Sequence, residues 1–201
     1  MKRGLPIHPE IPECANRVLR DSGFPLLSNG IGIDVEAIIE DFCGIEIAWI
    51  SGLRLGGREL LAAYISDIHT ILIEADCNPH RQRFSLAHEL GHAQLEHGFG
   101  STETLFQMQE PQTFLCVSDD TTARSSDERS KGRRRRLEIR ANQFASLLLM
   151  PEALVRQVWQ KYHDIVGCSQ LLGVSRQAME IKLEHLKLGS ATFDARSQRL
   201  I

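Results

Sequence analysis

The segment "RFSLAHELGHAQLEHG", residues 83–98, constrains the fold of this 201-residue chain more than any other part of its sequence. Apolar residues would lie on nearly every side of a helix built from it: Leu86, Ala87, Leu90, Ala93 and Leu95. A helix that is apolar most of the way round is typically buried. Burial of His88, Glu89 and His92 without partners would cost several kcal/mol. The segment therefore predicts a central helix whose polar side chains meet a specific partner.

The spacing of the two histidines indicates what that partner is. His88 and His92 stand at i and i+4, so their Cβ atoms lie roughly 5–6 Å apart on one helical face. Two imidazoles placed in this way can bind one tetrahedral zinc ion. Glu89 follows the first histidine and points beside the ion, where a general base for a metal-bound water is needed. The pattern His-Glu-x-x-His on a helix is thus typical of a metalloprotease, with Glu89 as the catalytic residue.

A catalytic zinc ion requires a third protein ligand. Glu138, in "LEIRANQFASLLLMPE", is the favoured candidate because one helical face then offers a carboxylate, the amide of Asn142 and the small Ala141, which allows a close approach to Gly91. Spacing alone does not separate this interpretation from an acidic residue that is merely favourable in a first helical turn. His97 lies about 140° further round the helix than the second histidine of the motif and is interpreted as a helix-end residue.

The remaining pattern predicts a mixed α+β fold. Helices are expected over 15–20, over 34–44 with Asp34 as N-cap, from Pro79 to about Gly98 with Asn78 as the capping residue, and over 137–150. Strands are expected over 45–51, 60–66 and 69–75, the last two joined by a tight turn at 66–68. An extended peptide could pair with the exposed edge of that hairpin.

Charge and composition exclude several classes of protein. A net charge of -3 and a pI near 6.2 argue against a dedicated nucleic-acid or membrane-surface binder. No apolar run is long enough to span a membrane, and the N-terminus lacks the apolar core of a signal peptide. The five cysteines are scattered without a C-x-x-C pair, which indicates reduced thiols. A cytoplasmic protein is expected.

For each of two segments, the sequence allows two interpretations. Residues 117–136 are polar and change from acidic to basic, and a solvated loop is favoured there over a nucleic-acid-binding segment. The stretch "CSQLLGVSRQAMEIKLEHL" predicts a helix, a turn at Gly173, an N-cap at Ser175 and a second helix, which is a helix-turn-helix outline. Its basic and acidic residues nearly cancel, so packing or repressor docking is favoured over direct DNA binding, and His185 is interpreted as an ordinary helix residue.

"RFSLAHELGH", followed downstream by "EIRANQFASLLLMPE", resembles the ImmA/IrrE-type zinc metallopeptidases, and the resemblance extends from about Val35 to Leu186. It implies a gluzincin-like zincin domain, with a small twisted sheet, an active-site helix and an edge strand that lines the cleft. It also implies one zinc ion per chain, held by His88, His92 and Glu138. The stretch between His92 and Glu138 is longer than is usual in the family.

The resemblance further implies the kind of substrate. Members of the family cleave a helix-turn-helix repressor encoded nearby and thereby release stress-response or mobile-element genes. We expect a zincin-like domain over residues 1–160 and a helical, helix-turn-helix-like extension over 161–201, packed on the same domain. The rival hypothesis is a non-enzymatic partner- or DNA-binding regulator with a structural or vestigial zinc site. Glu89 argues against it, because a structural site needs no base.

Overall fold

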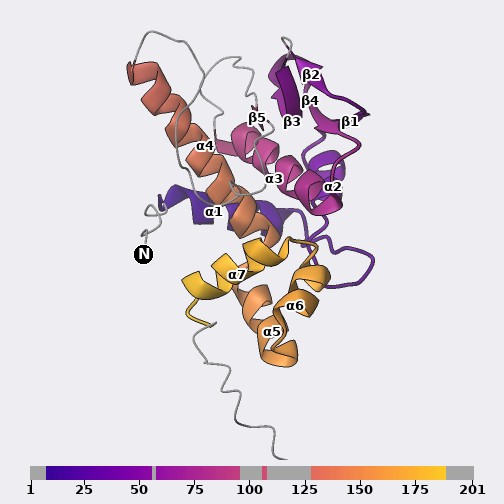
Figure 1. Ribbon diagram of the computed structural model, residues 1–201, viewed down its shortest axis with the longest axis vertical. Coiled ribbons are helices and arrows are strands. Elements are labelled where there is room, and N and C mark those ends of the chain that lie inside the picture. Colours follow the sequence, from indigo (N-terminus) through magenta and orange to yellow (C-terminus); the bar gives the residue numbers. More distant parts are fainter. Residues whose placement is uncertain (1–7, 56–57, 96–105, 108–127, 189–201) are drawn as a thin grey trace, which may run out of the picture.

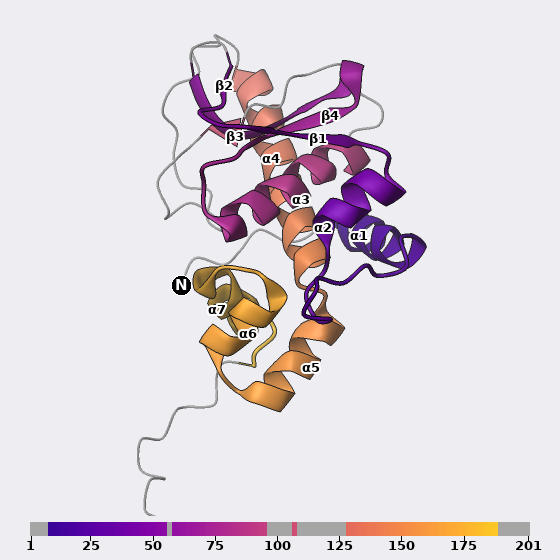
Figure 2. The same cartoon turned by 90° about the vertical axis from the view of Figure 1, so that its right-hand side faces the viewer.

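The computed structural model describes residues 8–55, 58–95, 106–107 and 128–188. A small sheet covers the long helix α3, which crosses α4, and helices α5 to α7 lie at the opposite end of the molecule (Figures 1 and 2). The helices are α1 (Glu10–Asp21), α2 (Val35–Ala37), α3 (Pro79–Leu95), α4 (Glu128–Leu149), α5 (Glu152–Tyr162), α6 (Ile165–Leu172) and α7 (Arg176–His185). The strands are β1 (Glu46–Ile50), β2 (Arg54–Leu55), β3 (Arg58–Ile65), β4 (Thr70–Glu74) and β5 (Phe106–Gln107). The expected α+β class is confirmed.

The sheet is built around the predicted hairpin. β3 and β4 are antiparallel and are joined by a short 3-10 turn at Ser66–Ile68, as the sequence indicated. β1 pairs with β4 in parallel, so β4 is an inner strand with four of its five residues buried. The order is β1-β4-β3-β2, and β5 also pairs with β3.

The expectation that the hairpin presents an exposed edge is wrong for much of its length. β1 covers β4, while β2 pairs with β3 at Arg58 and Glu59, and β5 pairs with it at Leu60 and Ala62. Within the described residues, only the end of β3 at 63–65 has no strand partner on its outer side. Periodicity fixes which residues form strands, but it contains no information on which strands become neighbours.

Short-range signals set the starts of several helices as expected. The side chain of Asp34 accepts the Ala37 N–H at the start of α2, which continues as a π-helical turn to Phe42. The Asn78 carboxamide oxygen accepts the His80 N–H at the start of α3. Ser175 caps α7, and Gly173 adopts φ 65° at the turn before it. These contacts span only a few residues, so sequence reasoning finds them.

Helix α4 begins nine residues before its expected start. Residues 128–136, assigned to the polar insert, are helical, so the loop interpretation is wrong there. Arg, Lys and Glu have high helix propensity and extend a helix that is already anchored by packing. The same finding removes one alternative, because Glu138 lies well inside α4 and not in its first turn. Residues 117–127 lie outside the described residues.

One hydrophobic cluster joins the two ends of the molecule. It contains residues of α1, the sheet, α3 and α4 together with Cys168, Leu172, Met179 and Leu183 of α6 and α7. The buried guanidinium of Arg83 donates to the backbone oxygens of Ile33 at 2.6 Å and Gly173 at 3.1 Å, which ties α3 to the α6–α7 turn. The helices of the described chain include none that is long and apolar enough to cross a membrane.

Candidate metal centre

Helix α3 presents both motif histidines to the same point. His88 and His92 are 0% and 2% exposed, and their Nε2 atoms lie 3.0 Å apart. The helix is buried on nearly all sides beneath the sheet, as its apolar sequence predicted. Because the two buried Nε2 atoms face each other at this distance, a shared proton or a bound cation between them would relieve the repulsion of their lone pairs.

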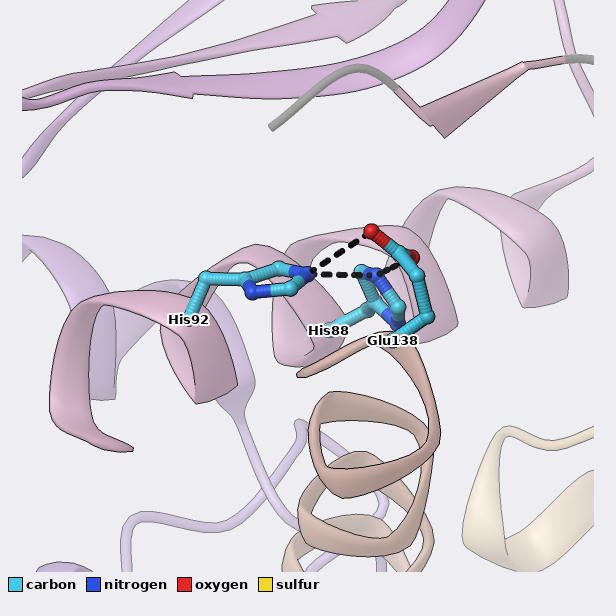
Figure 3. A group of neighbouring side chains, drawn as sticks. All are labelled: His88, His92 and Glu138. Atoms are coloured by element: carbon cyan, nitrogen blue, oxygen red, sulfur yellow. Dashed lines mark hydrogen bonds and ion pairs between the residues drawn. The ribbon is translucent and has the colours of Figure 1, made fainter. Parts of the chain in front are cut away.

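Helix α4 brings a carboxylate to the same point. The Glu138 oxygens lie 3.2 Å from His88 Nε2 and 3.7 Å from His92 Nε2, and the side chain is 26% exposed (Figure 3). The three candidate ligand atoms all lie within 4.8 Å of one another. The residue that the sequence left between two interpretations is therefore in contact with both histidines.

A missing side chain explains how α4 comes so close. A Cβ added at Gly91 would lie 3.1 Å from Phe144 Cδ1 and 3.2 Å from the Ala141 Cα and carbonyl oxygen. Such contacts are tighter than ordinary van der Waals separation and involve backbone atoms, which cannot easily move. The predicted close approach of Ala141 to Gly91 is confirmed, and it sets the separation of the two helices.

Asn142 orients the first histidine. Its carboxamide oxygen lies 3.0 Å from His88 Nδ1, so that nitrogen carries the proton and donates the bond. Nε2, the other ring nitrogen, faces Glu138 and His92 and is the atom that can bind a cation. The sequence placed the amide of Asn142 on the same helical face as Glu138 but assigned it no role, and its position at i+4 was the available signal.

Glu89 lies beside this cluster and is held from the sheet. Its Oε2 accepts the backbone N–H of Tyr64 at 3.0 Å, while its Oε1 is buried with no hydrogen-bond partner in the described part of the chain. The side chain is fully buried. Sequence reasoning could not find the contact with Tyr64, because any non-proline residue supplies the same backbone N–H.

The pKa values of the two carboxyl groups of the site are shifted in opposite directions. Burial raises the pKa of Glu89, and the charge of Glu138 acts in the same direction. Burial also favours the neutral form of Glu138, but hydrogen bonds and charge interactions with His88 and His92 outweigh it and lower the pKa of Glu138 to about 2. Glu138 is therefore an anion facing two imidazoles, whereas Glu89 has a raised affinity for a proton.

The residues present fit a zinc ion. Two imidazole nitrogens and one carboxylate form the donor set of an open catalytic site, and Asn142 holds one of the rings in the ligating tautomer. Among the described residues, the buried Oε1 of Glu89 is an acceptor without a hydrogen-bond partner. His97 lies outside the described residues, and His185 is exposed on α7.

Comparison of the sequence with known proteins found one family model and similar proteins. The model of a peptidase family described as the IrrE N-terminal-like domain matches residues 51–184. The radiation response metalloprotease IrrE of Deinococcus radiodurans is 24% identical over 169 residues, which cover 77% of this chain and 44% of that protein. The protein of the same name from Deinococcus deserti is 28% identical over 132 residues, which cover 65% of this chain and 38% of that protein. The chain thus spans less than half the length of these two relatives.

A solved structure shares the fold. A transcriptional regulator of Mycobacterium tuberculosis superposes with a TM-score of 0.59 at 18% identity, over 89% of this chain and 56% of that one. At this identity, the likeness concerns the fold alone.

Proposed function

This chain belongs to the ImmA/IrrE family of metallopeptidases, and on that premise we propose that it is a zinc-dependent endopeptidase with one metal ion per chain. The observation that carries the proposal is the convergence of two buried histidines and Glu138 beside a buried glutamate with an unused oxygen. A site built only for structure has its polar atoms satisfied and its metal closed by four protein ligands.

His88, His92 and Glu138 hold the metal in this proposal. Zinc, when bound, supplies a Lewis acid that lowers the pKa of water from 15.7 toward about 7. A carboxylate such as Glu138 is an anionic ligand near neutral pH, and Asn142 keeps His88 in position to ligate. The fourth position remains for water and substrate because the described site offers three ligands.

Glu89 moves the proton in this proposal. Its unpartnered Oε1 accepts a proton from the attacking water and passes it to the nitrogen of the leaving amine. The bond from the Tyr64 N–H to Oε2 fixes the carboxyl group while this occurs. Because Tyr64 belongs to the end of β3 without a strand partner in the described residues, a substrate backbone running along that end passes next to the base.

The substrate we propose is a partner protein, a helix-turn-helix repressor whose cleavage releases stress-response or mobile-element genes. We assign catalysis to residues 1–160 and propose that the extension 161–201, with its helix-turn-helix-like pair α6 and α7, docks the partner. Arg176 on α7 is paired with Glu180 at 2.8 Å, and Lys182 is buried. This leaves little free positive charge on α7, which favours protein docking over DNA binding.

Metal analysis tests the ligand set. Glu138→Ala should lose most of the zinc found in the wild-type protein while the fold largely survives, because two histidines alone leave the ion under-coordinated. Elemental analysis of the purified proteins measures the zinc, and circular dichroism measures the fold. Glu40→Ala, a change at an exposed glutamate, is the control and should keep full zinc. Full zinc in Glu138→Ala would remove Glu138 from the ligand set.

Co-expression with a neighbouring repressor tests the reaction. Glu89→Gln preserves size and removes basicity, so we expect proteolysis to fall by at least about 10²–10⁴-fold while zinc content persists. Mass spectrometry of the repressor identifies the fragments and the cut site, with Glu40→Gln as the matched control. Release of the intact repressor by wild type and Glu89→Gln alike, with no fragment, would establish the non-enzymatic regulator instead.

A further inference from the structure

The first turns of α4 form a strongly basic arm, which we define as residues 128–136. Six of its nine residues are Lys or Arg and one is Glu, a net charge of +5. The whole chain carries -3, so the other residues together carry -8. The arm is thus a concentration of positive charge in an otherwise acidic protein.

Among the described residues, Arg135 and Arg136 of the arm differ from other helical arginines in their ion pairs. Arg156 pairs with Glu152 at 2.7 Å, Arg176 pairs with Glu180, and Arg140 pairs with Glu10. Arg135 and Arg136 are exposed, and no carboxylate of the described residues lies within ion-pair distance of either. Like charges so close along a helix repel one another and reduce its stability. Arg135 and Arg136, which have no carboxylate partner among the described residues, are therefore complementary to an acidic partner.

The arm is also rigidly connected to the metal centre. It is continuous with the helix that carries Glu138, and Arg135 stands one turn before that residue. Figure 1 shows this end of α4 running past α3 and away from α5 to α7. At 1.5 Å per residue the arm extends about 14 Å from the centre. An extended peptide covers that distance in about four residues at 3.3 Å each.

We propose that this basic arm binds an acidic segment of the substrate protein, within about four or five residues of the bond that is cut. Arg is suited to this task because its planar guanidinium forms paired hydrogen bonds with a carboxylate. This inference rests on the proposed peptidase function for its biological meaning. The surface of the arm is present whether or not the protein is a peptidase, so binding can be measured independently of cleavage.

The test measures binding to a defined peptide. The zinc-loaded Glu89→Gln protein is titrated into a fluorescein-labelled decapeptide of Ala with four Glu, and into the same peptide with four Gln in their place. We expect the Glu peptide to bind and Arg135→Gln/Arg136→Gln to weaken binding at least about 10-fold, because two charge-assisted bonds are lost. Arg135→Lys/Arg136→Lys should retain most of the affinity, and added salt should weaken binding by all forms that retain the charge.

A matched control separates the arm from general charge. Arg20→Gln/Arg156→Gln removes the same charge from α1 and α5, outside the arm, and should leave the affinity unchanged. Circular dichroism checks that both double variants keep their helix content. The proposal would be overturned if the protein with the wild-type arm and the Arg135→Gln/Arg136→Gln variant bound the Glu peptide with equal affinity. It would also be overturned if a DNA duplex of equal charge bound the arm more tightly than the peptide. Neither result depends on whether Glu89 catalyses cleavage.

Discussion

Glu74 and Glu89 are both buried carboxyl groups close to the sheet, yet the fold treats them in opposite ways. Glu74, at the end of β4, accepts the backbone N–H groups of Leu53 at 2.5 Å, Asp76 at 3.0 Å and Gly52 at 3.1 Å. Glu89, on α3, accepts one N–H from Tyr64 and has an unpartnered oxygen among the described residues.

The pKa directions follow from these contacts. Burial would raise the pKa of Glu74, but the three N–H donors outweigh it and lower that pKa. For Glu89 burial prevails and the pKa is raised. The comparison shows that burial of a carboxyl group alone does not indicate whether the group is structural or catalytic. Where both carboxylate oxygens accept backbone N–H groups, the group stabilises a turn, and where one oxygen has no such partner among the described residues, it remains available for chemistry.

The largest effect that tests this comparison is on stability. Glu74→Gln should lower the free energy of unfolding by about 3 kcal/mol, because an amide N–H₂ then faces a backbone donor that loses its charged partner. Glu89→Gln should change it by less than about 1 kcal/mol, since the amide oxygen can still accept the Tyr64 N–H and no charge is buried. Urea denaturation of the zinc-free proteins measures both changes in the free energy of unfolding. Equal losses of stability would show that Glu89 is as structural as Glu74.

A smaller effect is expected on zinc affinity when the hydrogen bond between His88 and Asn142 is removed. Asn142→Ala should weaken zinc binding about 10–100-fold, because the proton on His88 Nδ1 loses its acceptor. Asn142→Asp, which preserves an acceptor, should bind zinc at least as well as the wild type. Competition with a zinc chelator gives the affinities, and Gln157→Ala, at an exposed amide on α5, is the control. If Asn142→Ala matched the control, the hydrogen bond would not contribute to the metal site.

The smallest effect concerns pH. The lowered pKa of Glu74 means that its stabilisation is complete above the unfolded-state pKa of about 4.3 and is lost as pH falls through the lower folded-state pKa. The difference in unfolding free energy between wild type and Glu74→Gln should therefore be constant near neutral pH and shrink only in acid. Melts of the zinc-free proteins from pH 7 to pH 3 measure this difference. A gap that widened in acid would contradict the assigned direction.

Much of this fold could be predicted from the sequence because the interactions that set it are local. The apolar pattern around His88 and His92 fixed a buried helix, and a helical repeat of 3.6 residues necessarily places i and i+4 on one face. The caps at Asp34 and Asn78 act within three residues. The hairpin turn at 66–68 is local as well. Each of these was predicted correctly, because the sequence contains both partners of the contact side by side.

The tertiary structure alone decided the contacts between distant segments. Asn142 meets His88 across 54 residues, and the Tyr64 N–H meets Glu89 across 25. The local sequence pattern likewise did not show three further features. These are the pairing of β1 with β4, the pairing of β5 on the outer edge of β3, and the early start of α4. Such contacts depend on how whole elements pack, here through the close approach of Ala141 to Gly91. The sequence alone determined that His88, Glu89 and His92 share one helix, and packing decided that Glu138 lies beside the two histidines, since only packing sets distances between elements.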